Sequence, residues 1–80
     1  MQTNCWHIKC NHTPETIDRI MMAFRKRGMT VNTFKYQKDS ESLATCFVEF
    51  DLDQENATRV YNNMIRVVDI LEVEVLTVVS

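Results

Sequence analysis

Residues 13–28 read TPETIDRIMMAFRKRG, and this stretch carries the start and stop signals of a helix. We expect Thr13 to be the N-cap and Pro14 to occupy the first helical position, where a missing N–H costs nothing. Acidic residues fall in the first turn and residues 25–27 read RKR at the far end, so both sets of charges suit the helix dipole. Gly28 can adopt the left-handed conformation that ends a helix. The stretch therefore predicts a helix bounded by Thr13 and Gly28.

The segments around this helix have clear periodicity. Residues 5–10 alternate, with Trp6, Ile8 and Cys10 on one side, which predicts a half-buried strand with that side toward the core. Within the helix the apolar residues recur at the spacing of a single stripe. They are Ile17, Ile20, Met21 and Phe24.

The second half of the chain repeats this organisation. Residues 29–36 and 43–50 flank a polar turn at residues 37–42 and predict a hairpin, with Ala44, Cys46, Val48 and Phe50 on one face. Asp53 is expected to cap a second helix, in which Leu52 packs on Ala57. Its apolar stripe is Ala57, Val60, Tyr61 and Met64.

After a turn at residues 67–69, a last strand is expected at residues 70–79. Leu71, Val73 and Val75 should point inward, and Glu72 and Glu74 outward. The order strand, helix, strand, strand, helix, strand predicts a ferredoxin-like α+β fold. In this fold a four-stranded antiparallel sheet carries both helices on one face, and residues 1–80 form a single domain.

Composition narrows the function classes. With 45% hydrophobic and 25% charged residues, the chain resembles an ordinary globular protein. A net charge of −2 argues against a nucleic-acid partner, which usually meets a dense basic face. No run is long enough for a membrane span, and residues 1–4 do not resemble a signal peptide. The three cysteines are expected to be free thiols in a cytoplasmic protein.

Three local motifs resemble one family. Residues 14–20 (PETIDRI) and 27–31 (RGMTV) resemble the opening of ACT domains in the small regulatory subunit of acetolactate synthase. Residues 63–73 (NMIRVVDILEV) resemble a segment near the end of the same domain. The resemblance spans nearly the whole chain, in order and at the right spacing. The short length, and Glu15 after the proline, look most like the isozyme II type.

The resemblance implies a regulatory protein without catalytic activity of its own. Such a chain binds and activates the large catalytic subunit of acetolactate synthase in branched-chain amino-acid biosynthesis. Thiamine diphosphate, Mg²⁺ and flavin belong to that partner in the family, so this chain is expected to need no cofactor. We also expect a homodimer. The alternative is a stand-alone homodimeric ACT module that senses amino acids or drives oligomerisation.

The resemblance also implies an effector site. Its candidate residues are Asn11, His12, Thr13, Glu15 and Thr16 in the first loop, with Thr30 at the start of the second strand. Family members that bind valine usually carry Asn-x-Pro-Gly, where this chain reads HTPE at residues 12–15. The Glu15 carboxylate would repel the carboxylate of an amino acid, and Thr30 stands where an asparagine is expected. These changes argue against feedback binding of valine.

Single residues also suggest a metal site, a nucleophile and a base-stacking face. Cys5, His7, Cys10 and His12 suggest a metal site, but their spacing differs from that of structural zinc sites, so no metal is expected. A cysteine nucleophile with a histidine base is possible in principle. Phe34, Tyr36 and Phe47 are expected on the sheet face away from the helices, where RNA-binding domains of this architecture stack bases.

Overall fold

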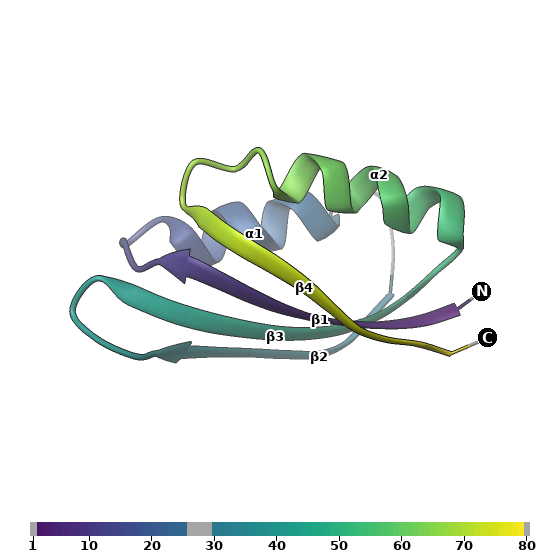
Figure 1. Ribbon diagram of the computed structural model, residues 1–80, viewed down its shortest axis with the longest axis horizontal. Helices are drawn as coiled ribbons and strands as arrows, with labels where there is room; N and C mark the ends of the chain where they lie inside the picture. The colour runs from purple at the N-terminus through teal and green to yellow at the C-terminus, as the bar shows by residue number, and fades with distance from the viewer. Residues whose placement is uncertain (1, 26–29, 80) are drawn as a thin grey trace.

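The computed structural model describes residues 2–25 and 30–79. The elements are β1 (Gln2–Asn11), α1 (Thr16–Arg25), β2 (Thr30–Lys38), β3 (Leu43–Leu52), α2 (Gln54–Met64) and β4 (Ile70–Val79). The strands form one antiparallel sheet in the order β2-β3-β1-β4, and both helices cover the same face of it (Figure 1). The predicted ferredoxin-like βαββαβ fold is confirmed.

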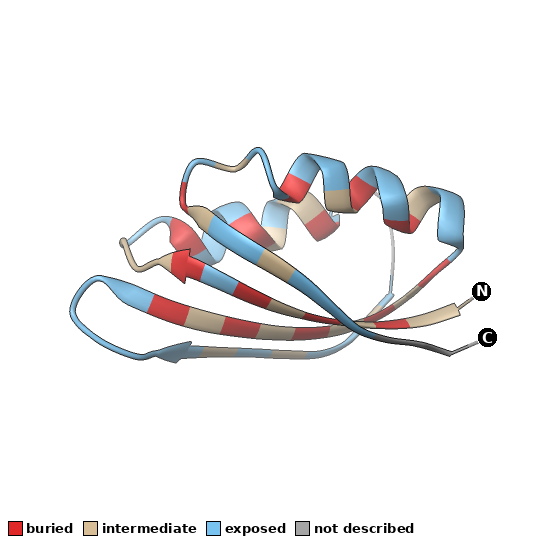
Figure 2. Cartoon of the chain, in the orientation of Figure 1, coloured by how far each residue is buried: buried red, intermediate tan, exposed pale blue. Residues whose placement is uncertain are grey.

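The core lies between the sheet and the helices. Buried residues alternate along β1 and β3, as Figure 2 shows, because successive side chains of a strand point to opposite faces. Trp6 lies at the centre, with its ring 4.8 Å from Phe50, 5.8 Å from Tyr61 and 6.0 Å from Phe24, measured between centroids. The rest of the buried apolar set is Ile8, Cys10, Ile20, Ala44, Cys46, Val48, Leu52, Ala57, Val60 and Met64.

The start of α1 differs from the prediction. The helix begins at Thr16, so Thr13 and Pro14 belong to the loop before it. Thr16 is fully buried and occupies the first position of the inward stripe, while Ile17 is 39% exposed. A polar residue can take this position because the loop satisfies its hydroxyl. The predicted stop at Gly28 lies outside the described residues.

The second helix agrees with the prediction at its N-terminus. Asp53 is the N-cap, and its Oδ2 accepts a hydrogen bond of 3.1 Å from the backbone N–H of Asn56. Leu52 and Ala57 are both buried in the core. The two helices have 10 and 11 residues, and neither is long and apolar enough to span a membrane.

Strand β4 departs from simple alternation. The pairing register shifts between Lys9 and Cys10, which lie opposite Glu72 and Ile70. Leu71 is the extra residue of this bulge and is 57% exposed, so its predicted inward position is wrong. Val73 packs against the core as expected.

The predicted open-face aromatics are also partly wrong. Phe34 and Tyr36 lie opposite the buried residues Val48 and Cys46, which places their side chains on the helix side of the sheet. Phe47, opposite His7 and Lys35, is on the open face as predicted. The sequence does not show which face of β2 is buried, because Val31 and Phe34 fall on opposite faces of a regular alternation.

Candidate functional site

The first loop, residues 12–15 between β1 and α1, is held on two sides by the backbone. At its start the N–H of Asn11 donates to the carbonyl of Asp69 at 2.8 Å. The N–H of His12 donates to the carbonyl of Ser42 at 2.7 Å. The loop is therefore fastened both to the β2–β3 hairpin and to the turn before β4.

Thr16 organises the inside of the loop. Its Oγ1 accepts the N–H of Thr13 at 3.0 Å and lies 2.9 Å from Thr13 Oγ1. The same hydroxyl donates to the carbonyl of Asn11 at 2.8 Å. One side chain thus closes the loop on itself, and it uses a backbone donor that a ligand would otherwise need.

A partly buried ion pair lies next to Thr16. The Asp69 residue is 7% exposed, and its Oδ2 accepts a hydrogen bond of 2.5 Å from Arg19 Nη1. Thr16 Oγ1 lies 3.5 Å from the same carboxylate oxygen. A buried carboxylate requires such partners, because removing its charge from water costs roughly several kcal/mol. The pair joins the first turn of α1 to the residue before β4.

Tyr36 and His12 complete this polar cluster on the β2 side. Tyr36 Oη lies 2.9 Å from His12 Nδ1, and the two rings are 5.8 Å apart between centroids. Burial, followed by the neighbouring Cys10, raises the pKa of Tyr36 to about 12. The phenol therefore stays protonated at neutral pH and acts as a hydrogen-bonding group.

The cysteines show no sign of activation as nucleophiles. Burial raises the pKa of Cys10 and raises that of Cys46 to about 12. The pKa of Cys5 is raised as well, by burial and then by the charge of Glu49. A nucleophilic thiol needs a lowered pKa, so the observed shifts oppose the cysteine–histidine chemistry considered from the sequence.

The structure brings five of the six predicted effector residues together. Asn11, His12, Thr13 and Thr16 take part in the loop contacts above. Glu15 is exposed, and its backbone carbonyl accepts the N–H of Arg19 at 3.0 Å.

Thr30 is not near these residues within one chain. It lies opposite Asp51, which in turn lies opposite Thr3, whereas Asn11 lies opposite Leu43 at the other end of the sheet. Three members of the cluster were missing from the prediction: Arg19, Tyr36 and Asp69. Arg19 and Asp69 both lie within the motifs that carry the family resemblance, and this position is the one sequence feature that could have indicated them.

The suspected metal ligands are spread over different surfaces. Cys5 and His7 share the open face of the sheet with Glu49 and Phe47, Cys10 is buried on the helix side, and His12 is in the loop. Within residues 2–25 and 30–79, no group of three or more His, Cys, Asp or Glu side chains could hold a metal ion.

Exposed apolar side chains occur at the end of α2, in the following turn and along the edge strand β4. They are Ile65, Val68, Leu71, Val75 and Leu76, from the end of α2, the following turn and β4, and we call them the apolar edge. Val68 is the most exposed of them, at 78%. Because β4 is an edge strand, its outer backbone groups are open to pairing with another chain.

No protein-family profile and no curated protein matches this sequence. Solved structures do match it. The small subunit of acetolactate synthase from Thermotoga maritima superposes with a TM-score of 0.83 at 10% identity, over 96% of this chain and 48% of that one. The ACT domain of GTP pyrophosphokinase from Chlorobium tepidum gives 0.81 at 16% identity, over 92% and 96%.

The regulatory subunit of aspartate kinase from Thermus thermophilus gives a TM-score of 0.72 at 13% identity, over 94% of this chain and 50% of that one. This chain thus spans about half the length of either regulatory subunit. At such low identity the likeness concerns the fold alone. That fold, a ferredoxin-like sheet covered on one face by two helices, is the fold of ACT regulatory domains.

Proposed function

We propose that this chain is a non-catalytic regulatory ACT domain, and that it is the small subunit of an acetolactate synthase of the isozyme II type. It would bind the large catalytic subunit and hold it in its active conformation. The observation that carries the proposal is the superposition of almost the whole chain on the Thermotoga maritima small subunit. The sequence motifs at residues 14–20 and 63–73 support it, because they contribute the Arg19–Asp69 pair.

The apolar edge supplies a surface for this association. It combines exposed aliphatic side chains with an unpaired strand edge, so a partner can gain both apolar burial and backbone hydrogen bonds. We propose that the domain uses it to dock to the catalytic subunit or to a second copy of itself. The free thiols of all three cysteines fit a reducing compartment, and we place the protein in the cytoplasm.

The first loop favours activation without strong valine feedback. The N–H groups of Asn11, His12 and Thr13 already donate within the protein, so they are not available to a ligand carboxylate. Glu15 adds a negative charge at the exposed side of the same loop. We expect valine to bind weakly if at all, and Glu15→Gly to strengthen the binding by removing the repulsion. Titration calorimetry on both proteins checks this, and no gain with any branched-chain amino acid would count against the loop as an effector site.

A pull-down from the native cell extract tests the proposal as a whole. The tagged chain should recover a large acetolactate synthase subunit, identified by mass, and adding the chain to that purified subunit should raise its activity several-fold. Val68→Glu should weaken recovery, while Met22→Glu, at an exposed position on α1, should not. Recovery of the chain alone would instead support the second candidate, a free-standing homodimeric ACT module, which the open edge of β4 also suits.

A further inference from the structure

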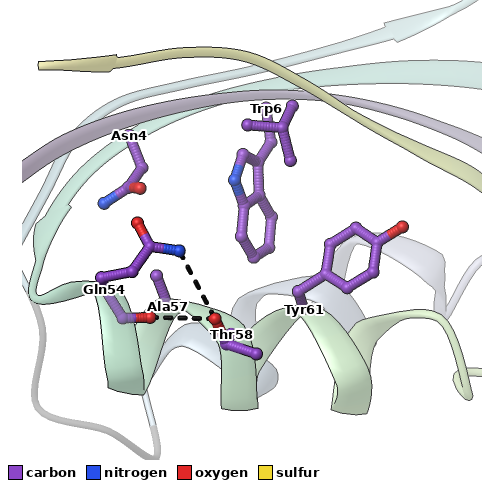
Figure 3. Close-up of a pocket in the computed structure, with 7 residues that line it drawn as sticks. Asn4, Trp6, Gln54, Ala57, Thr58 and Tyr61 are labelled. Atoms are coloured by element: carbon purple, nitrogen blue, oxygen red, sulfur yellow. Dashed lines mark hydrogen bonds between the residues drawn. The ribbon is translucent and has the colours of Figure 1, made fainter.

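A cavity of about 200 Å³ lies between α2 and the β1–β4 side of the sheet, away from the first loop (Figure 3). Its lining comes from three elements: Asn4 and Trp6 of β1, Val75 of β4, and Gln54, Ala57, Thr58 and Tyr61 of α2. Trp6, Ala57 and Val75 give it apolar walls. The Trp6 and Tyr61 rings meet at 90°, so two aromatic surfaces line it from different sides.

Two buried polar side chains at this cavity have unused hydrogen-bonding atoms. Asn4 is 1% exposed, and its Nδ2 donates to the carbonyls of Gln2 at 3.2 Å and Leu52 at 3.3 Å. Its Oδ1, however, accepts no hydrogen bond from any residue in the described part of the chain. This oxygen is not fully buried and faces the open pocket, so it can accept a hydrogen bond from a donor placed there.

Trp6 presents the complementary group. It is 2% exposed, and among residues 2–25 and 30–79 nothing accepts a hydrogen bond from its indole N–H. Figure 3 shows the indole nitrogen on the edge of the ring that faces the amides of Asn4 and Gln54. Asn4 and Trp6 thus offer the cavity one acceptor and one donor beside a surface of aromatic rings. A ligand that carries a donor and an acceptor next to each other would satisfy both.

The charge of the lining narrows the ligand further. None of the seven lining side chains is ionisable as an acid or a base near neutral pH. A carboxylate or ammonium group would lose part of its hydration here without gaining a charged partner, which is unfavourable. A neutral amide loses much less, because Asn4 and Trp6 replace its water contacts.

We propose that this cavity binds a small neutral carboxamide carried on a flat ring. The amide N–H donates to Asn4 Oδ1, the amide oxygen accepts the Trp6 indole N–H, and the ring packs against Trp6, Tyr61 and Val75. The site lies under α2 and involves none of the first-loop residues. It also needs no catalytic subunit, so its test is independent of the proposed function.

The test uses the single tryptophan of the chain. In a ¹H–¹⁵N spectrum of the full chain, the Trp6 indole N–H gives one isolated peak. Benzamide should shift this peak downfield in a saturable way, with a millimolar Kd typical of so small a ligand. Benzoate, which has the same ring and a negative charge, should bind at least tenfold more weakly.

Two matched variants on α2 locate the binding. Thr58→Phe places a large ring at an exposed lining position and should abolish the benzamide shift. Asn63→Phe, at an exposed position outside the lining, should leave it unchanged. Should Thr58→Phe not fold, nuclear Overhauser contacts from the benzamide ring protons to Trp6 and Val75 in the unmodified chain replace it.

Three outcomes would overturn the proposal. One is the absence of a saturable shift with benzamide. Another is an equal response to benzoate, and the third is a response that survives Thr58→Phe. A shift of the Trp6 peak that depends on protein concentration without ligand would also overturn it, because a second copy would then fill the cavity.

Discussion

At the scale of single residues, the Arg19–Asp69 pair joins the first turn of α1 to the residue before β4. Asp69 is almost fully buried, whereas the Arg19 side chain is 43% exposed and so keeps part of its hydration. The stabilisation is therefore smaller than for a fully buried pair.

We expect Asp69→Asn to lower the free energy of unfolding by about 2 kcal/mol, because it leaves Arg19 without its partner and weakens the contact to Thr16. Urea unfolding measures the change. The control is Glu72→Gln, which removes the exposed pair with Lys9 at 3.8 Å and should cost at most about 0.5 kcal/mol. Equal losses in the two variants would contradict a special role for Asp69.

The raised pKa values of the Cys46 thiol and the Tyr36 phenol predict a loss of stability at high pH. Burial raises the pKa of Cys46 from 9.0 to about 12 and that of Tyr36 from 10.0 to about 12. Between pH 9 and pH 12 the unfolded chain releases protons from these groups that the folded chain retains. Their contribution to the free energy of unfolding is therefore complete below pH 9 and is lost as the pH rises toward 12. Chemical unfolding at a series of pH values should show this fall. Cys46→Ala should make it shallower, and an unchanged slope in that variant would contradict the assignment.

At the scale of elements, α2 depends on its cap. The pKa of Asp53 lies below its ordinary value because the side chain and backbone N–H groups of Asn56 donate to the carboxylate. We expect Asp53→Ala to lower Tm by about 5 °C and Asp53→Asn to lower it much less, since asparagine caps nearly as well. Scanning calorimetry distinguishes the two. Equal losses would mean that charge, and not the capping hydrogen bond, stabilises the helix end.

The elements also show which parts of the structure the sequence can predict. Strands β1 and β3 and helix α2 follow their periodicity, because each has one buried face and one exposed face. The start of α1 was predicted incorrectly, because the burial of Thr16 depends on its contacts with Asn11 and Asp69. No local sequence pattern indicates these contacts.

The site was predictable only in part, for a similar reason. The first loop was found from its neighbouring helix signals. Tyr36 and Asp69 join it through strand register and a turn 53 residues away from Thr16 in sequence, as the Thr16–Asp69 contact shows. The bulge at Leu71 likewise arises from pairing with β1 and leaves no trace in the alternation of β4.

At the scale of the whole molecule, we propose the apolar edge as the surface through which the chain associates. We expect Val68→Glu to shift the chain toward the monomer in sedimentation velocity, because a buried carboxylate without a partner disfavours association. The shift should exceed tenfold in dissociation constant. Met22→Glu on α1 is the matched control and should sediment like the unmodified chain. A monomeric unmodified chain that also fails to bind a larger partner would contradict this role of the edge.

The position of β1 has a kinetic consequence. This strand lies between β3 and β4, so its pairings join Gln2 to Leu52 and Thr3 to Val79. Strand β1 can pair only after distant segments reach it. Each pairing therefore closes a long loop, and the entropy of loop closure is lost before the stabilising contacts form. The chain should accordingly refold more slowly than a helical bundle of equal size. During synthesis, β1 remains without either neighbour until most of the domain has left the ribosome, which exposes its apolar face to aggregation in that interval.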